Sequence, residues 1–510
     1  MTAKREHSPH TKSVGESAKP LTGASTSNAK TWKEIKWDQV EVEVKRLQMR
    51  IAKATQEKRF GKVKALQWLL THSYNAKRLA VKRVTANKGA KTPGVDGVIW
   101  STSKQKLEAI NDLYRRGYRA EPLRRIYIPK KNGKQRPLGI PTMKDRAMQA
   151  LYLLSLEPVA EITADPNSYG FRCERSTQDA MEQCFCALSR KVAAEWILEA
   201  DIKSCFDQIS HEWLLSNVVI DRQVLQQWLK AGYLEKQRLF STKEGTPQGG
   251  IISPTLANIA LNGIEKIVKA KFVKSQKVNL IRYADDFVVT GATPEILEQV
   301  KSIVTSFLAE RGLELSKEKT RITSIHQGFD FLGFNFRKYN QILLIKPAKD
   351  SIKKVRATIR EVTKRSGATT TVNLIKQLNS KLRGWANYYR HVVSSRAFAA
   401  VDSEVFHSVW QWATRRHPHK NATWIRNKYF RQRGNRNWVF SAMDKDKQGK
   451  KRPLDIVIVN STPIKRYVKV RGLATPYDPA YREYFEQRRQ RKKSSTSGYW
   501  SKCIAPIRFQ

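Results

Sequence analysis

The chain has 510 residues, room for roughly two to four domains, and its 95 Lys and Arg against 45 Asp and Glu give a net charge of +50 and a pI near 10.2. Such an excess repels itself in a free protein, and a polyphosphate backbone usually offsets it, so nucleic acid is the expected partner. No apolar run reaches the ~18 residues of a membrane span, there is no apolar signal core, and five cysteines form no paired framework. These features exclude membrane and secreted proteins and predict a reduced protein of the cytoplasm or an organellar matrix.

The first 90 residues divide into two parts. Residues 1–30 are rich in Ser, Thr, Lys and Ala and are expected to be a disordered basic leader. Apolar residues at three- and four-residue steps then predict two amphipathic helices over 32–84, whose other faces are basic. We expect residues 31–90 to be a helical RNA-binding extension, although charged helix faces are more often merely solvated.

A hairpin with a basic tip is predicted next. Residues 124–129 alternate as a strand, Asn132-Gly133 supplies the turn, and residues 136–141 return. Lys130 and Arg136 flank the tip, where cations of this kind could clamp the triphosphate of a nucleotide in a polymerising enzyme. A solvated hairpin is the alternative.

Three carboxylates are the candidates for a metal site. Residues 281–289 predict a tight hairpin with Asp285 and Asp286 at its tip, and a buried strand over 196–202 leads to Asp201. Two carboxylates held this close repel each other unless a cation or a proton lies between them. A divalent metal is therefore predicted, although Asp is also common in turns for purely local reasons.

A glycine-rich segment lies between these carboxylates in the sequence. Gln248, Gly249 and Gly250 follow Gly245-Thr246-Pro247 and open a helix expected to run to about Lys271. Glycines here would let the backbone approach a base or a sugar closely, but glycine pairs also form ordinary loops. A helix over 293–311 and a last strand over 329–336 are expected to follow.

Beyond Lys346 the composition changes, which indicates a domain boundary. A helical apolar stripe over 374–389 is mostly core, whereas aromatic and cationic residues alternate from Trp410 onward, a pattern that suits base stacking and phosphate contact. After Asn460 the chain is expected to be irregular, with a solvated basic tail at 488–493. The candidate RNA- and DNA-binding residues are Arg383, Trp385, Arg390, Arg415, Arg416, Arg431 and Arg433.

The order of these segments resembles the reverse transcriptases encoded by group II introns, which also act as maturases. The resemblance covers roughly residues 32–490. The part around 382–389 resembles the thumb, or maturase-specific domain X. The motifs that carry the resemblance are Ala200-Asp201 with Phe206-Asp207, residues 245–250, Tyr283-Ala284-Asp285-Asp286, Phe331-Leu332-Gly333-Phe334, and residues 382–389.

This resemblance implies an α+β right-hand polymerase of fingers, palm and helical thumb, followed by a small basic DNA-binding domain. The expected divisions are 91–345 for fingers and palm, 346–445 for thumb and domain X, and 446–510 for a DNA-binding region and tail. The implied activity is RNA-directed DNA polymerisation together with help in splicing and retrohoming. The implied partners are the intron RNA, a DNA target and primer, and deoxynucleoside triphosphates.

The resemblance also implies roles for individual residues. Asp201, Asp285 and Asp286 are expected to hold two Mg²⁺ ions, and Phe206 to exclude a ribose 2′-hydroxyl. Lys130 and Arg136 are expected to clamp the triphosphate. The remaining residues expected to contact the substrate are Gln248, Gly249, Gly250 and Tyr283.

Two departures from the family pattern qualify these expectations. Glu174 stands in a loop where relatives tend to carry a small or basic residue. The sequence has no His-Asn-His pattern and only Cys503 where many relatives have paired Cys-x-x-Cys sites, so no second-strand cleavage is expected. A maturase with an idle polymerase and a viral RNA-templated RNA polymerase are the alternatives, and Phe206 and domain X disfavour the second.

Overall fold

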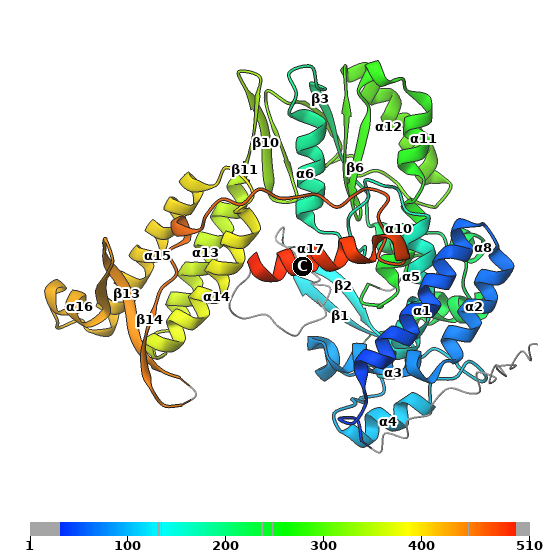
Figure 1. Ribbon diagram of the computed structural model, residues 1–510, viewed down its shortest axis with the longest axis horizontal. Helices are drawn as coiled ribbons and strands as arrows, with labels where there is room; N and C mark the ends of the chain where they lie inside the picture. The colour runs from blue at the N-terminus through cyan, green and yellow to red at the C-terminus, as the bar shows by residue number, and fades with distance from the viewer. Residues whose placement is uncertain are drawn as a thin grey trace, which may run out of the picture.

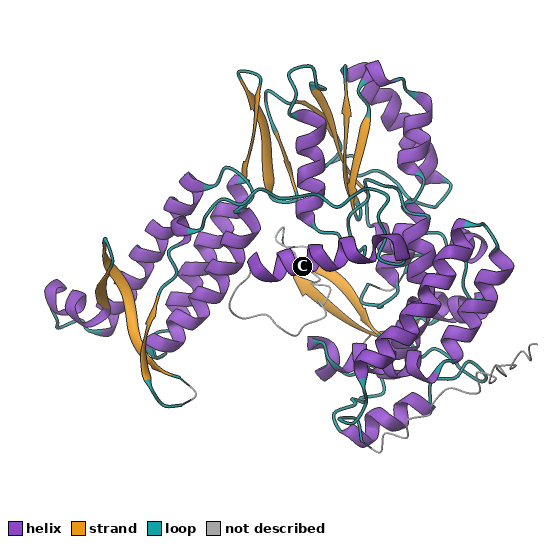
Figure 2. Ribbon diagram, viewed as in Figure 1, coloured by secondary structure: helices purple, strands orange, loops and turns teal. Residues whose placement is uncertain are grey.

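The computed structural model describes residues 31–129, 133, 135–235, 238–246, 248–446 and 448–495 (Figure 1). The expected leader, Lys130 and Cys503 lie outside these residues. The described chain contains both helices and strands, and the described strands form four sheets (Figure 2). Within the described residues no helix combines the length and the apolar character that crossing a bilayer requires.

The N-terminal part forms three helices where two were predicted. They are α1 (Trp37–Gln56), α2 (Phe60–His72) and α3 (Tyr74–Thr85), and all three pack on α5 (Met143–Ile162). The extra break arises at Ser73, whose backbone is extended, while Lys58 with φ +54° ends the first helix. Two short helices, η1 (Lys88–Lys91) and α4 (Ser103–Asn111), follow.

The predicted basic hairpin is confirmed. It consists of β1 (Leu123–Pro129) and β2 (Gln135–Ile140), paired antiparallel with Arg136 opposite Ile128. Two strands that were not predicted, β4 (Tyr233–Glu235) and β5 (Arg238–Phe240), extend this sheet in the order β2-β1-β4-β5.

The central sheet has the strand order β6-β7-β3-β8. The helices α6 and α12 pack against its strands. The single helix expected to reach Lys271 is broken into two at Asn262-Gly263, because Gly263 adopts φ +97°. The elements of this part are β3 (Trp196–Asp201), β6 (Asn279–Tyr283), β7 (Asp286–Gly291), β8 (Arg321–Ser324), α6 (Thr177–Leu188), α7 (Cys205–Gln208), α8 (His211–Asn217), α9 (Arg222–Lys230), α10 (Ser253–Leu261), α11 (Ile264–Lys271), η2 (Lys274–Gln276) and α12 (Pro294–Ala309).

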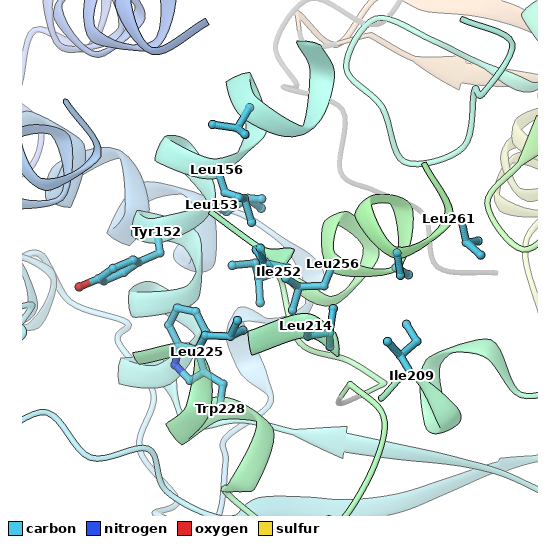
Figure 3. Close-up of a cluster of buried hydrophobic side chains, with 14 of the residues drawn as sticks. Tyr152, Leu153, Leu156, Ile209, Leu214, Leu225, Trp228, Ile252, Leu256 and Leu261 are labelled. Atoms are coloured by element: carbon cyan, nitrogen blue, oxygen red, sulfur yellow. The ribbon is translucent and has the colours of Figure 1, made fainter. Parts of the chain in front are cut away.

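A continuous apolar core supports this sheet and joins it to the N-terminal helices. Figure 3 shows the part of it in which Leu153 and Leu156 of α5 face Trp228 of α9 and Leu256 of α10. Each of these four side chains is almost fully buried. Burial of such side chains stabilises a fold by about 1.5–3 kcal/mol each, so this core holds the central sheet in place.

The predicted last strand over 329–336 is in fact two strands. Leu332 and Gly333 have φ +52° and +80° and form a turn that separates β9 (Phe329–Phe331) from β10 (Phe334–Tyr339). A third strand, β11 (Ile342–Pro347), completes a sheet in the order β11-β10-β9. Phe329 and Phe336 stack on it with ring centroids 4.9 Å apart.

Four helices follow the compositional boundary at Lys346. They are α13 (Lys349–Arg365), α14 (Thr371–Tyr389), α15 (Ser395–Arg416) and α16 (Ala422–Tyr429). A sheet of β12 (Phe430–Arg433), β13 (Arg436–Lys445) and β14 (Lys451–Asp455) comes next. The expected boundary between 445 and 446 is wrong, because it falls inside the β13–β14 hairpin, where Lys445 pairs with Lys451.

The end of the described chain is helical, and within the expected solvated tail residues 489–491 are exposed but Arg488 is not. After η3 (Val459–Ser461) and η4 (Pro479–Tyr481), α17 (Arg482–Ser495) packs with Phe485 1% exposed. Arg488, at the start of the expected tail, is buried in an ion pair with Asp179 of α6. The sequence expectation failed because this arginine finds a carboxylate more than 300 residues away, which no local pattern reveals.

Candidate active site

The three predicted carboxylates meet at one edge of the central sheet. β3 and β7 pair antiparallel with Asp201 directly opposite Asp286, and residues opposite each other in such a pair point to the same face. β6 and β7 close a tight hairpin in which Tyr283 pairs with Asp286. Asp285 therefore lies in the turn, beside the Asp201–Asp286 pair, as the sequence predicted.

A buried arginine supports this turn. The Arg282 guanidinium is fully buried and donates to the Ala284 carbonyl at 3.2 Å, to Asn258 Oδ1 at 3.1 Å and to Asn262 Oδ1 at 3.0 Å. Burial lowers the pKa of Arg282 to about 10. Ala284 adopts the left-handed φ of +59°, which is sterically costly for a residue other than glycine, and the bond from Arg282 helps to hold the turn in this conformation.

A second segment, residues 167–170, packs against the same turn. The Tyr169 N–H donates to the Arg282 carbonyl at 2.9 Å, and the Arg282 N–H donates to the Asn167 carbonyl at 2.9 Å. At Gly170 the contact is so close that an added Cβ would lie 2.3 Å from the Ala284 nitrogen. Only glycine fits there, so this loop fixes the position of the carboxylate turn.

The electrostatics of the site favour a bound cation. Burial, followed by the neighbouring Asp201 and Asp285 charges, raises the pKa of Asp286 to about 7, although the residue as a whole is exposed. Burial also raises the pKa of Asp285. The ammonium group of Lys319 lies 2.5 Å from Asp201 Oδ2 and balances part of the charge. No sequence pattern indicated the position of this lysine, which lies on the loop before β8.

The carboxylates at this site have the chemistry that a divalent metal needs, but they are not yet arranged as a complete ligand set. Carboxylate oxygens are the ligands that Mg²⁺ prefers, and a cation stabilises three crowded carboxylates, of which Asp285 and Asp286 have raised pKa values. Among the residues that the structure describes, however, no three His, Cys, Asp or Glu side chains already converge as a ligand set. Lys319 occupies one side of Asp201 in this arrangement.

The predicted substrate residues gather beside the carboxylates. Gln248 Nε2 donates to both oxygens of Asp207 at 2.7 Å, and Gln248 Oε1 accepts from Arg136 Nε at 2.7 Å. The Gly139 N–H donates to the Gln248 carbonyl at 2.8 Å. A hydrogen-bonded chain thus joins the basic hairpin, the glycine-rich segment and the residue after Phe206.

The neighbouring glycines and aromatics have distinct surroundings. Gly249 has φ +116°, and an added Cβ would lie 2.6 Å from the Gly139 carbonyl oxygen, so only glycine suits this position. Gly250 is buried, while Phe206 and Tyr283 are half-buried. The Phe206 ring meets Phe171 edge-on with centroids 6.2 Å apart. The structure therefore brings Phe206 and the glycine-rich segment together.

The candidate nucleic-acid residues after Lys346 are not gathered in one place. Trp385 packs against Tyr389 and Phe398, with ring centroids 4.9 and 5.5 Å away, so its ring belongs to the helical core rather than to an open surface. Arg416 donates to the Gly367 and Thr369 carbonyls, and Arg433 pairs with Asp455 at 2.8 Å. Three others donate hydrogen bonds within their own segments: Arg390 to Asn387, Arg415 to the Gln411 carbonyl and Arg431 to the Phe430 carbonyl. Arg383 is exposed.

Comparison with known families defines the class of protein. The family described as "Reverse transcriptase (RNA-dependent DNA polymerase)" matches residues 128–336, and the "N-terminal domain of reverse transcriptase" matches residues 32–113. The "Group II intron, maturase-specific domain" matches residues 352–430. The chain is therefore a reverse transcriptase in class, and enzymes of this class depend on a divalent metal.

Individual relatives identify the family to which the chain belongs within this class. The chain is 34% identical to Protein YkfC of Escherichia coli (strain K12) over 300 residues, which span 50% of this chain and 78% of that protein. It is 30% identical over 410 residues to the group II intron-encoded protein LtrA of Lactococcus lactis subsp. cremoris, covering 61% of this chain and 68% of LtrA. A telomerase from Candida albicans is a distant structural neighbour, with 13% identity, a TM-score of 0.36 and coverage of 69% of this chain and 68% of that one. The chain belongs to the group II intron-encoded reverse transcriptases and maturases.

Proposed function

We propose that this RNA-directed DNA polymerase extends a DNA primer on an RNA template, with Asp201, Asp285 and Asp286 holding two Mg²⁺ ions. The observation that carries the proposal is the pairing of Asp201 with Asp286 beside the Asp285 turn. When bound, the ions would lower the pKa of the primer 3′-hydroxyl and neutralise charge on the departing pyrophosphate. The protein itself contributes positioning and charge, through a turn held by Arg282 and Gly170.

The basic hairpin and the glycine-rich segment form the nucleotide pocket in this proposal. Arg136 supplies a cation for the triphosphate, as does Lys130, which lies outside the described residues. Without substrate, Arg136, Gln248 and Asp207 are already linked to one another by hydrogen bonds. A bound triphosphate would therefore replace one of these bonds with a charge-assisted hydrogen bond. Gln248, Gly249 and Gly250 would face the template nucleotide, and Tyr283 the primer end.

Phe206 is proposed to select deoxynucleotides. Its ring is half-buried and is backed by Phe171, so it has little freedom to swing away from a sugar. A ribose 2′-hydroxyl would clash with a ring held in this way. Steric discrimination of this kind is worth about 1–3 kcal/mol, or about tenfold to two-hundredfold in rate.

The wider partners are intron RNA, a DNA target and the splicing and retrohoming reactions that join them. The maturase-specific match over 352–430 and the net charge of +50 support this extension of the proposal. Exposed Arg383 and Arg415 are the better candidates for RNA contact, because Arg416 and Arg433 are committed to partners within the chain. Splicing of the intron at low Mg²⁺ should speed up when the protein is added, and equal rates would contradict this part of the proposal.

Primer extension on an RNA template tests the polymerase and its sugar selection together. The unaltered chain should make cDNA from deoxynucleotides and little product from ribonucleotides. Phe206→Ala should raise ribonucleotide use by about tenfold to a hundredfold relative to deoxynucleotides. An unaltered chain that uses both sugars equally would contradict the role of Phe206, and one that extends no primer while binding RNA tightly would indicate a maturase without a working polymerase.

A further inference from the structure

Residues 456–491 form a segment that we call the C-terminal strap. It leaves β14, runs along the helices α14 and α15, crosses to α6 and returns as α17 (Figure 1). Phe485 and Val470 of the strap are 1% exposed and belong to the same apolar cluster as Ile281 and Val288 of the central sheet. The strap is therefore an integral part of the fold.

The first half of the strap is bound to the thumb, meaning the helices α13–α16. Side chains on α14 and α15 and backbone just beyond α14 provide its partners. The hydrogen bonds run from the Val457 N–H to Asn379 Oδ1 (2.7 Å), from the Val459 and Asn460 N–H groups to the Asp402 carboxylate (2.7 and 2.8 Å), from the Lys465 N–H to the Arg390 carbonyl (3.0 Å), and from His391 Nδ1 to the Lys465 carbonyl (2.6 Å).

The second half is bound to the palm, here α5, α6 and the loop between them. The hydroxyl groups of Tyr467 and Ser176 lie 2.9 Å apart, and the Val470 N–H donates to Asp179 Oδ1 at 2.7 Å. Arg175 donates to the Gly472 and Ala474 carbonyls at 3.2 Å. Tyr477 donates to Glu157 of α5 at 3.1 Å.

Arg488 locks this half in place. Its side chain is 9% exposed and faces Asp179, which is 0% exposed, at 2.8 Å. The same guanidinium donates to the Val468 carbonyl at 2.6 Å and to the Tyr467 hydroxyl at 2.9 Å, so it ties α17 to the crossing point of the strap. Removing one partner of a buried ion pair leaves an uncompensated charge, which makes such a pair an effective anchor.

The segment of the strap that crosses from the thumb to the palm is short. Lys465 hydrogen-bonds to the thumb and Tyr467 to the palm, and an extended chain spans at most about 3.6 Å per residue, or about 7 Å over these two steps. The chain also joins palm to thumb where β11 ends at Pro347 and α13 begins at Lys349. A body joined at two points rotates far less freely than one joined at a single point.

The strap also explains why Glu174 stands where relatives tend to carry a small or basic residue. Arg489 of α17 pairs with Glu174 at 2.7 Å, on the loop that follows Phe171. A small or basic residue at this position would give Arg489 no partner. Glu174, which differs from the family pattern, therefore helps to bind the strap.

We propose that Arg488 is a positioning residue that, through the strap, holds the thumb against the palm and so sets how many nucleotides are added per encounter with a template and primer. This inference rests on the proposed polymerase function and takes the thumb to hold the template–primer duplex. The hydrogen bonds described above join the strap to the thumb, α5, α6 and the loop between them, and not to Asp201, Asp285 or Asp286. The strap therefore controls retention of the duplex and leaves the rate of a single addition unchanged.

The test compares Arg488→Gln with Arg482→Gln, a matched change on the same helix whose side chain is 79% exposed. Each variant is given an RNA template with an annealed DNA primer, and heparin is added to trap enzyme that dissociates. Arg488→Gln should make cDNA several-fold shorter per encounter with an unchanged rate of single-nucleotide addition, Arg488→Lys should be intermediate, and Arg482→Gln should match the unaltered chain. Equal product lengths in all four proteins would overturn the proposal.

Two further outcomes are decisive. If Arg488→Gln does not fold, Arg489→Gln, which removes only the partly exposed pair with Glu174, takes its place: shorter products support the strap and equal lengths overturn it. If the unaltered chain extends no primer, the polymerase proposal and the strap inference fail together. Extension by the unaltered chain with no change in Arg488→Gln overturns the strap inference alone.

Discussion

At the scale of single residues, the carboxyl group of Asp286 links acidity, stability and metal binding. Burial and two neighbouring carboxylates raise its pKa to about 7, from 3.8 in an ordinary aspartate. In the metal-free protein the folded state thus keeps a proton between about pH 4 and pH 7 that the unfolded state has lost. Stability from this group is present below pH 4 and falls as the pH rises towards 7.

A bound cation reverses this loss, because it stabilises the ionised form. Mg²⁺ should therefore raise the melting temperature more at pH 8 than at pH 6, and half-maximal nucleotide addition should need more Mg²⁺ at pH 6. Thermal unfolding with and without Mg²⁺ at the two pH values measures the first effect. Asp286→Asn is the control and should weaken the pH dependence; an equal Mg²⁺ effect at both pH values in the unaltered chain would contradict the assignment.

At the scale of elements, the loop at 167–170 is expected to hold the carboxylate turn. Gly170→Ala would place a methyl group 2.3 Å from the Ala284 nitrogen, so the turn must shift and polymerase activity should fall at least about tenfold. Gly384→Ala, in α14 with no atom within 4 Å of the new Cβ, is the matched control and should stabilise the protein by about 0.5–1 kcal/mol. Primer extension and thermal unfolding of both variants check this, and full activity in Gly170→Ala would contradict the role of the loop.

The elements that carry the carboxylates could be predicted from the sequence, and their surroundings could not. The strand ending at Asp201 and the hairpin around Asp285 have strong local patterns, and both are present. The breaks at Ser73, Gly263 and Leu332-Gly333 depend on single backbone conformations that periodicity does not register. Lys319, Arg282 and Arg488 were missed as site or anchor residues because a basic side chain looks the same in sequence whether it faces solvent or a buried carboxylate.

At the scale of the whole molecule, the charge of +50 governs affinity for nucleic acid. Each phosphate neutralised releases counterions, so affinity for RNA should fall steeply with salt, by about 10³–10⁵-fold between 50 and 200 mM if 6–10 phosphates are contacted. Filter binding across this range measures the slope. Arg383→Gln should make the slope shallower, whereas Arg433→Gln, which loses the pair with Asp455, should leave it unchanged. A flat salt dependence would contradict an electrostatic interface.

Single-turnover addition of one deoxynucleotide on an RNA template, followed as a function of Mg²⁺ concentration, tests whether all three carboxylates hold the metal. Asp201→Asn, Asp285→Asn and Asp286→Asn are compared with Asp112→Asn, an exposed aspartate at the end of α4. We expect the rate to fall by about three orders of magnitude in each of the first three variants and to stay unchanged in the fourth. Near-normal addition by any one of the three would contradict a metal site built from all three carboxylates.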